Sequence, residues 1–584
     1  MDIFAILKFI GGLALFLYGM DAMGKGLEKN SGGKLKSILE KLTSNKFKGV
    51  LLGAAVTGII QSSSATTVMV VGFVNSGIMK ISQAISIIMG ANIGTTVTAW
   101  LVSLMGIKGD SIAIKMLNPT SFTPILALVG IILLMFARSQ KKKDIGGILL
   151  GFSVLMFGMF TMTESVAPLK DVPEFTRLLT LFSNPVIGVL AGAVVTGIIQ
   201  SSSASVGILQ ALSVTGTITY SAAIPIIMGQ NIGTCVTALL SSIGANKNAK
   251  RAAMAHLYFN IIGTVLFLAI YYSIDAVVDF AFADNIINAA GIAIVHTLFN
   301  VLSTIVLLPF TQQLERLVCL TIKSDDAPED EEFKVLDERL IATPGFAVDQ
   351  CFKTTCKMAE LARDTLFNSM SLMKVYSRTR ADEVIYGESK VDQYEDKIGT
   401  YLVKLSGKDL SDEDGRNASK ILHCIGDFER ISDHAVNIMQ VAGEINEKKI
   451  SFTKEANEDL HIMYSAAKEI INISFDSFIK NDIDLAKKVE PLEQVIDNLN
   501  VQLKARHIER LRKGECTTEM GFIFSDLITN YERIADHCSN IAICVIQINQ
   551  DNYDTHDYIL NLKNSDDQHY NTEYQVFSEK YILS

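Results

Sequence analysis

Polar and apolar residues are distributed along this chain in two different patterns. Up to about residue 312, charged residues are few, and several apolar segments approach the length that a helix needs to cross a bilayer, roughly 20 residues. Beyond residue 312, apolar residues recur at helical spacing among many charges, with few Gly or Pro. The pattern predicts an all-α protein, in which a polytopic membrane domain is followed by a soluble helical domain.

The apolar segments of the first half form two similar sets. Each set consists of one span, a hairpin with a polar tip, and two further spans. The segments lie at about 3–20, 50–78, 83–104 and 120–137, then at about 144–162, 189–217, 222–244 and 253–273, with a last span at about 286–310. We therefore expect internal repeats over about 3–137 and 144–273.

Two sequence motifs recur at one fixed offset. V-T-G-I-I-Q-S-S-S-A at residues 56–65 returns almost unchanged at 195–204, which is 139 positions later. M-G-x-N-I-G-T at 89–95 returns at 228–234 with the same offset. A Gln followed by three Ser is unsuited to a continuous membrane helix, and it favours a break at which the chain turns back. The repeat therefore predicts two re-entrant helical hairpins at corresponding places.

Loop charges predict how the repeats are oriented. If each hairpin enters and leaves on one side, each repeat crosses the membrane three times, and the second repeat is inverted relative to the first. With the N-terminus outside, the inside loops hold 15 Lys and Arg residues and the outside loops hold four. Positive charge is concentrated on the cytoplasmic side of membrane proteins. The sequence thus predicts a multi-pass protein of the cell (inner or plasma) membrane whose C-terminal domain is cytoplasmic.

Length and composition divide the chain further. At 584 residues it is too long for one compact domain, and its net charge of -10 averages two unlike halves. The eight Cys residues have neither CxxC nor zinc spacing, so no disulfide framework is indicated. The polar tail is expected to be poorly ordered. The expected parts are a membrane domain at 1–312, an acidic linker at 313–340, a helical domain at 341–550 and the tail at 551–584.

The polar breaks carry the candidate binding chemistry. A helix that starts at a Ser run offers unpaired N–H groups and the positive end of its dipole to an anion. Interrupted segments in inverted repeats point to a substrate site near the membrane midplane. Two such tips could enclose a tetrahedral oxyanion without Arg or Lys. The predicted anion-binding residues are Gln61, Ser62, Ser63, Ser64, Gln200, Ser201, Ser202 and Ser203.

A second set of polar residues suits a hard monovalent cation. Carbonyl, amide and hydroxyl oxygens could bind sodium, and a cation beside the anion would offset its charge, which is a physical basis for cotransport. The predicted sodium-binding residues are Asn92, Thr95, Thr98, Asn231, Thr234 and Thr237. The alternative is structural, because Ser and Thr in membrane helices often bond the backbone and small residues often mark helix contacts. Recurrence at matched places in both repeats argues for the binding site.

The charged half contains a repeat of its own. Helices are expected near 345–376, 380–406, 411–446, 453–480, 483–513 and 517–549, which makes two sets of three. F-E-R-I-S-D-H at 428–434 matches Y-E-R-I-A-D-H at 531–537. Glu and Asp four residues apart share a helix face, and carboxylates from two helices can hold metal ions in a bundle. The candidate ligands are Glu388, Asp392, Glu429, Asp433, Glu490, Glu532 and Asp536.

The metal site has a structural alternative. Paired acids on exposed helices are usually solvated or neutralised, here by Arg430 and Arg533, which stand beside the two motifs. The counterparts of Glu388, Asp392 and Glu395 in the second set are Glu490, Gln494 and Asp497. Gln494 therefore occupies the place of Asp392, which weakens the metal prediction.

The motifs resemble two known families. The paired Q-S-S-S motifs, each followed by N-I-G-T-x-x-T at 92–98 and 231–237, are similar to the bacterial sodium–phosphate cotransporter family related to animal type II cotransporters. That resemblance covers about 1–312 and implies sodium-driven phosphate uptake, with Thr234 and Thr237 where that family's sodium-binding threonines lie. The repeats differ at Thr96 against Cys235, so the halves need not contribute equally.

The E-R-I-x-D-H repeats resemble the PhoU family of phosphate-regulation proteins over about 345–549. This second resemblance implies a regulatory domain and, as in some members, iron or zinc clusters; manganese is a further candidate.

The sequence therefore predicts a sodium-coupled symporter of inorganic phosphate with a cytoplasmic regulatory domain. The alternative is a membrane phosphate sensor that signals through the helical bundle without net transport. An enzyme using Ser64 or Ser203 is not expected, because there is no G-x-S-x-G elbow and neither hairpin contains a His; His256 and His296 lie elsewhere. The expected partners are phosphate, sodium, the lipid bilayer and further copies of the chain, with no nucleic acid.

Overall fold

A computed structural model describes residues 3–40, 45–106, 119–323, 333, 335–408, 410–550 and 568–583. Within these ranges the regular structure is helical, and the extended backbone pairing is an isolated bridge between Thr219 and Ile286. The all-α prediction is confirmed. The chain forms two compact units, Met1–Phe346 and Ala347–Ser584. Within the expected acidic linker, residues 324–332 and 334 lie outside the described residues, and its beginning and its end are helical.

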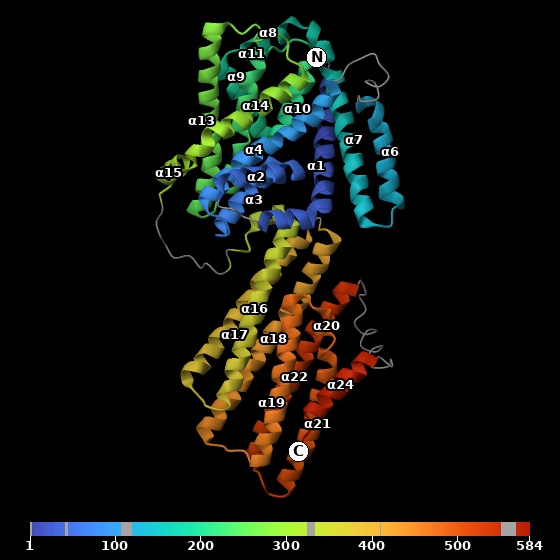
Figure 1. Ribbon diagram of the computed structural model, residues 1–584, viewed down its shortest axis with the longest axis vertical. Coiled ribbons are helices and arrows are strands. Elements are labelled where there is room, and N and C mark those ends of the chain that lie inside the picture. Colours follow the sequence, from blue (N-terminus) through green and yellow to red (C-terminus); the bar gives the residue numbers. More distant parts are fainter. Residues whose placement is uncertain are drawn as a thin grey trace. The chain divides into compact units, whose positions relative to one another are not determined.

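The helices of the first unit follow the predicted sets (Figure 1). The first set is α1 (Ile3–Glu40), α2 (Lys46–Ile60), α3 (Ser63–Asn75), α4 (Ile81–Ser103) and α6 (Pro119–Phe136). The second set is α7 (Gln140–Val166), α9 (Pro185–Ile199), α10 (Ser202–Ser213), α11 (Tyr220–Gly233), α12 (Cys235–Ser241) and α13 (Lys247–Val278), with the short α8 (Pro173–Leu181) inserted. α14 (Ala289–Leu307), α15 (Thr311–Thr321) and the 3₁₀ turn η4 (Glu338–Ala342) complete the unit.

The two sets share their helix-terminating residues. Asn45 and Asn184, 139 positions apart, each cap the helix that follows by accepting two backbone N–H bonds on the side-chain oxygen. Both of these helices are 15 residues long and both end at a Gln in the left-handed conformation. The segments expected at 50–78 and 189–217 are thus broken hairpins, α2–α3 and α9–α10, as predicted.

Glycines let the arms of each set pack at backbone distance. α2 lies against α4, and α9 against α11. A Cβ on Gly53 would lie 1.9 Å from the carbonyl oxygen of Ile87, and one on Gly192 would lie 2.1 Å from that of Ile226. Association of membrane helices depends on such close packing at small residues, because lipid offers no hydrophobic driving force between them. The glycines of the repeat therefore fix which helices pair.

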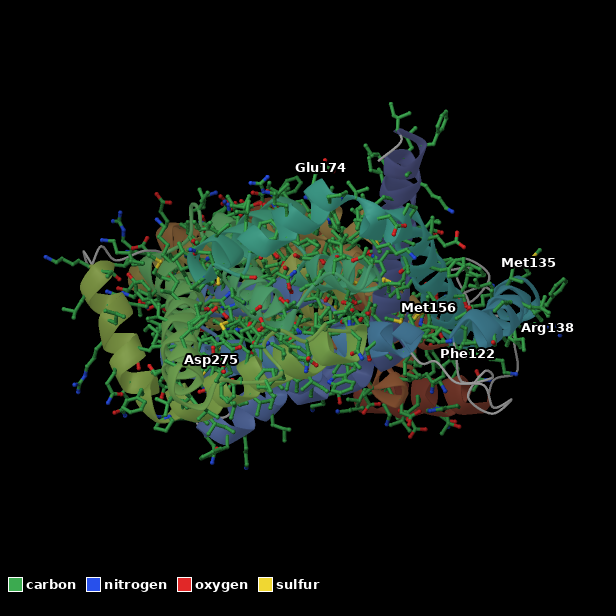
Figure 2. All side chains as sticks on the ribbon, turned by 90° about the horizontal axis from the view of Figure 1, so that it is seen from above. Phe122, Met135, Arg138, Met156, Glu174 and Asp275 are labelled. Carbon is green, nitrogen blue, oxygen red and sulfur yellow. The ribbon has the colours of Figure 1, made fainter. Side chains whose placement is uncertain are left out.

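Six helical segments of the described chain are long and apolar enough to span a membrane. They are Ile3–Lys29, Ile81–Ser103, Gln140–Asp171, Tyr220–Ser241, Lys247–Val278 and Ala289–Thr321. Large apolar side chains remain exposed along these helices, as a lipid-facing surface requires. Figure 2 shows Met135 of α6 at the outer edge, whereas Met156 of α7 lies further in and is buried. The chain is a membrane protein.

The second unit is a bundle of long helices. These are α16 (Pro344–Leu372), α17 (Arg378–Ser406), α18 (Asp412–Lys448), α19 (Lys454–Lys480), the short α20 (Ile483–Ala486), α21 (Val489–Arg512) and α22 (Thr518–Gln550). Their apolar faces meet in a core that includes Phe428, Phe475 and Phe478, with ring centroids 5.0–5.1 Å apart.

One expectation about the tail was wrong. Residues 551–567 lie outside the described residues, but 568–580 form helix α24, which packs on α21. Its buried Phe577 explains why this polar segment is held, and the following Tyr581 is buried too, its hydroxyl donating to Glu469. A pair of aromatic residues thus gives a polar helix one apolar face.

Candidate functional site

Both polar breaks adopt the same backbone conformation. Gln61 and Gln200 each have φ 58° and ψ 22°, in the left-handed region that non-glycine residues seldom occupy. Their N–H groups close the preceding helices by bonding to the carbonyls of Thr57 and Thr196. Each chain then turns directly into a new helix. The predicted interruption is therefore a defined helix–turn–helix junction, formed twice.

Serine hydroxyls begin the second helix of each hairpin. Ser62 Oγ accepts from Ala65 N at 3.1 Å, and Ser201 Oγ accepts from Ala204 N at 3.3 Å, so both residues are N-caps. The first four N–H groups of a helix have no acceptor within it, and each cap satisfies one of them. The remaining N–H groups and the positive helix end give these tips their capacity to bind an anion.

The two tips meet. Ser64 Oγ, in the first turn of α3, donates to the carbonyl oxygen of Gln200 at 3.3 Å across 136 residues of sequence. α10 also packs on α4, where the Gln210 amide donates to the carbonyl of Ala99 at 3.0 Å. The structure therefore brings one predicted anion-binding residue of each repeat, Ser64 and Gln200, into contact.

The two halves of the site differ in their hydrogen bonds. In the first half, Thr98 Oγ1 donates to Gln61 Oε1 at 2.9 Å, and Gln61 is buried. In the second half, the equivalent Thr237 donates to the carbonyl of Thr234 in its own helix, and Gln200 is exposed. The Gln and Thr side chains are thus hydrogen-bonded to each other in the first repeat, whereas the equivalent Thr of the second repeat bonds to a backbone carbonyl instead.

A second pair of hydroxyls follows this asymmetry. Thr57 Oγ1 donates to Thr66 Oγ1 at 3.1 Å within the first hairpin. The corresponding Thr196 and Ser205 are at most 1 % exposed, and neither hydroxyl has a partner among the described residues. The amide oxygen of Gln230, on α11, is likewise buried without a partner in the described chain. Buried polar groups normally have a hydrogen-bond partner. These three oxygens therefore point to a bound ligand in the second half.

The predicted sodium ligands mostly bond within their own helices. Thr95 and Thr234 donate to the carbonyl four residues earlier at 3.0 and 2.9 Å, and Asn231 does the same at 2.9 Å. Asn92 differs, because its amide nitrogen donates to Asn260 Oδ1 at 3.0 Å. In each case the hydroxyl or amide oxygen keeps lone pairs that could face a cation. Their role as ligands stays a prediction.

Sequence reasoning missed a polar network that joins α4, α12 and α13. His256 Nε2 lies 3.2 Å from Asn92 Oδ1, and Asn260 also donates to Cys235 Sγ at 3.3 Å. The signal was present as H-x-x-x-N-x-x-x-T, which occurs at 256–264 and again at 296–304. Residues four apart stack on one helix face, and all six motif side chains are buried. His256 and Asn260 thus connect α13 to α4 and α12, and Thr304 of α14 donates to the carbonyl oxygen of Met89 on α4 at 3.5 Å.

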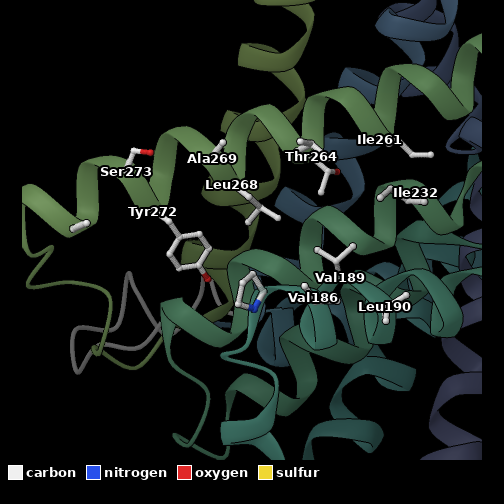
Figure 3. Close-up of a pocket in the computed structure, with 13 residues that line it drawn as sticks. Val186, Val189, Leu190, Ile232, Ile261, Thr264, Leu268, Ala269, Tyr272 and Ser273 are labelled. Carbon is white, nitrogen blue, oxygen red and sulfur yellow. The ribbon is translucent and has the colours of Figure 1, made fainter.

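A groove elsewhere on the unit has a different character. It holds about 730 Å³ between α9 and α13 and is lined mainly by apolar residues (Figure 3). Val189 and Leu190 form one wall, and Leu268 and Tyr272 form the other. No predicted ion-binding residue lines it. An apolar groove on lipid-facing helices suits hydrocarbon rather than a phosphate ion.

The second unit gathers carboxylates at two corresponding places. Glu493, Asp497 and Asp536 come close enough for one oxygen from each to lie within 4.8 Å of the others. Burial and neighbouring carboxylates raise the pKa of Glu388, Glu429 and Glu532 above the ordinary value. Asp433 and Asp392 are the carboxylates that raise the pKa of Glu388. Among the carboxylates that raise the pKa of Glu532, Asp536 has the largest effect. Each place thus concentrates negative charge that a cation would relieve.

The expected alignment of the second set needs correction. Glu490 is buried and accepts a hydrogen bond from Ser539, away from the cluster. Glu493 stands in the cluster instead, so E-x-x-x-D at 388–392 corresponds to 493–497. With this alignment Asp497, not Gln494, is the partner of Asp392, and both sets keep both acids. Arg430 and Arg533 do pair with their motifs, at 3.2 Å from Asp433 and Asp536, as the structural alternative expects.

Comparison with known proteins agrees with this division. The family model of the Na+/Pi-cotransporter matches residues 15–164 and 166–285, and that of the PhoU domain matches 355–442 and 460–545. "Putative inorganic phosphate export protein YjbB" of Escherichia coli (strain K12) is 20% identical over 550 residues, covering 93% of this chain and 97% of its own length.

Two further relatives match parts of the chain. "Uncharacterized protein YqeW" of Bacillus subtilis is 31% identical over 318 residues, which is 54% of this chain and 98% of the relative. "Sodium-dependent phosphate transport protein 2A" of Rattus norvegicus is 40% identical over 99 residues, which is 16% of this chain and 15% of the relative. The matched residues of the Na+/Pi-cotransporter model lie in the first unit, and those of the PhoU model lie in the second.

Proposed function

Because this chain belongs to the Na+/Pi-cotransporter family and carries a PhoU domain, we propose that it is a sodium-coupled symporter of inorganic phosphate. The observation that carries the proposal is the meeting of the two Q-S-S-S tips through Ser64 and Gln200. Two helix N-termini directed at one place offer N–H and hydroxyl donors to a tetrahedral oxyanion. Neutral donors bind phosphate without the strong attraction of Arg or Lys, which favours release on the other side.

Sodium binding is assigned mainly to the second repeat. Its buried Thr196 hydroxyl and Gln230 amide oxygen have no partner in the described chain, and Gly233 packs directly against Thr196. Thr234 follows immediately, so oxygen atoms from α9 and α11 lie around one junction. A cation there would offset the charge of phosphate at the tips, which makes the binding of the two ions cooperative. In the first repeat the equivalent hydroxyls satisfy each other.

The membrane arrangement completes the proposal. We assign the repeats to opposite orientations and the second unit to the cytoplasm on the basis of loop charge. Transport then consists of alternating exposure of the two tips, as in other transporters with inverted repeats. The direction of net flux follows from the gradients. The relative in Escherichia coli is named for export and the rat relative for sodium dependence.

The test is phosphate flux in proteoliposomes that contain the full-length protein. We expect an inward sodium gradient to drive accumulation of labelled phosphate, and an outward gradient to drive efflux from preloaded vesicles. Replacing sodium by potassium should abolish both. Phosphate binding without sodium-dependent flux in either direction would instead establish the sensor, which is the second candidate function.

The second unit is proposed to be a regulatory domain that holds a metal ion. The carboxylate oxygens of Glu493, Asp497 and Asp536 fit a divalent ion of manganese or iron better than zinc, which prefers nitrogen and sulfur ligands. Glu388, Asp392, Glu429 and Asp433 form the corresponding set. The ion would neutralise carboxylates that otherwise repel each other, and so would stabilise the bundle. The conformation of the bundle would then depend on whether the metal site is occupied.

A pair of substitutions tests this assignment. Glu493→Gln should lower the metal content of the full-length protein, because it takes a charged oxygen out of this cluster and leaves the corresponding set intact. Glu490→Gln should leave the metal content unchanged, because that side chain bonds to Ser539. Elemental analysis after metal-supplemented expression gives the answer. Equal metal loss in both variants would show that the cluster is not the site.

A further inference from the structure

The segment that precedes the second unit is docked onto the end of the first hairpin. Residues 335–346, called the latch here, bury Leu340 completely and Phe346 almost completely. The Phe346 ring lies against Phe73 of α3, with centroids 4.6 Å apart. Leu340 packs on Gly72, and a Cβ added to Gly72 would lie only 3.0 Å from Leu340 Cδ2. The apolar side of the latch thus fits the last turn of α3.

An ion pair within the latch joins two helices of the membrane unit. The Asp337 carboxylate accepts a hydrogen bond from the Asn75 amide at the C-terminus of α3 and pairs with Arg339 at 2.9 Å. The Arg339 guanidinium donates to the carbonyl oxygen of Ser241, the last residue of α12, at 2.7 Å. A cation at this position bonds to a carbonyl that the helix leaves unpaired and opposes the helix dipole.

Asn75 extends the same connection to α13. Its side-chain oxygen accepts from the backbone N–H of Asn246 at 2.8 Å, and its carbonyl accepts from the Asn246 amide at 2.8 Å. Asn246 is in turn the N-cap of α13. The ends of α3, α12 and α13 are therefore held together, and the latch supplies the charged pair that completes the junction.

We propose that the latch is an autoinhibitory contact through which the second unit controls transport. The inference rests on the proposed function, because it names the regulation of the same site. α3 begins at Ser63, in the first tip, and α12 begins beside Thr234, in the second repeat. A rigid helix transmits any movement of its first turn to its last. While the latch binds both C-termini, the first tip and the Thr234 junction of the second repeat are held in one relative position.

The position of the latch in the chain explains how it is controlled. It continues without interruption into α16, the first helix of the regulatory domain. A change of shape in that domain therefore acts on the latch through the covalent chain. Releasing the latch frees α3 and α12 to move, and the rate of transport rises.

The experiment measures flux and amide hydrogen exchange in the full-length protein. Asp337→Ala and Leu340→Ala each remove one part of the latch, one polar and one apolar. Allosteric couplings are typically about 5- to 150-fold, so we expect each variant to raise the initial rate of sodium-driven phosphate flux about fivefold or more. Exchange in the last turn of α3 should also become faster. Glu338→Gln, an exposed position beside Asp337, is the control and should change neither quantity.

The outcomes separate this proposal from the proposed function. Unchanged or slower flux in both latch variants, with wild-type flux intact, would overturn the latch. Absence of sodium-dependent flux in the wild type would overturn the symporter instead. In that case the latch is judged by exchange at residues 63–67: faster exchange in the variants supports it, and unchanged exchange refutes it.

Discussion

A Gly53→Ala variant is expected to lose most of its folded protein, because one methyl group cannot be accommodated where α2 crosses α4. The added carbon would lie 1.9 Å from the carbonyl oxygen of Ile87, and that atom belongs to a helical backbone that cannot turn aside. Overpacking a core costs about 1–3 kcal/mol when side chains can adjust, and more when they cannot. The yield of monodisperse protein in detergent and its melting temperature measure the effect.

Gly147→Ala provides the matched control. Gly147 also lies within a membrane helix, α7, but no atom lies within 4 Å of the position that its methyl group would take. Alanine is the better helix former by about 1 kcal/mol, so this variant should be at least as stable as the wild type. Normal folding of Gly53→Ala would show that the two helices do not pack at backbone distance.

Ser203→Ala is expected to lower sodium-driven phosphate flux about tenfold or more while leaving the amount of protein in the membrane unchanged. Ser203 occupies the tip of the second hairpin, and among the described residues its hydroxyl makes no bond like that of Ser64 to Gln200. A hydrogen bond to a charged group contributes about 1.5–3 kcal/mol, and 1.4 kcal/mol corresponds to about tenfold. Initial rates at subsaturating phosphate give the measurement.

A serine at the other end of the same helix is the control. Ser213 donates to the carbonyl of Gln210, three residues earlier, so its hydroxyl only bonds within the helix. Ser213→Ala should therefore transport at close to the wild-type rate. If Ser203→Ala did the same, the second tip would not belong to the phosphate site.

Features that depend on local sequence could be predicted well. The breaks at Gln61 and Gln200 follow from residues that interrupt a membrane helix, and both formed where expected. The two tips could be paired with each other because their Q-S-S-S motifs occur at corresponding positions of the repeat. Because the two copies share nearly the same letters, they share caps, breaks and glycine contacts.

Features that depend on rotation about a helix axis or on distant partners could not be predicted. Glu490 and Glu493 are three residues apart on one helix, and only packing decides that Ser539 takes the first and the cluster takes the second. The asymmetry of the two halves could not be predicted either, because Thr57 and Thr196 are the same residue type in the same motif. Thr57 donates to Thr66, whereas Thr196 and the corresponding Ser205 make no such bond in the described chain, and the sequence does not give the geometry that separates the two cases.

The left-handed glutamines also bear on how cleanly such a carrier can work. A residue at φ 58° is separated by sterically forbidden conformations from the other allowed regions of its backbone. A junction built on it cannot bend gradually, since it must pass from one basin to another in a single step. For the proposed sodium-coupled transport, two such junctions would leave few intermediate conformations in which sodium could cross without phosphate.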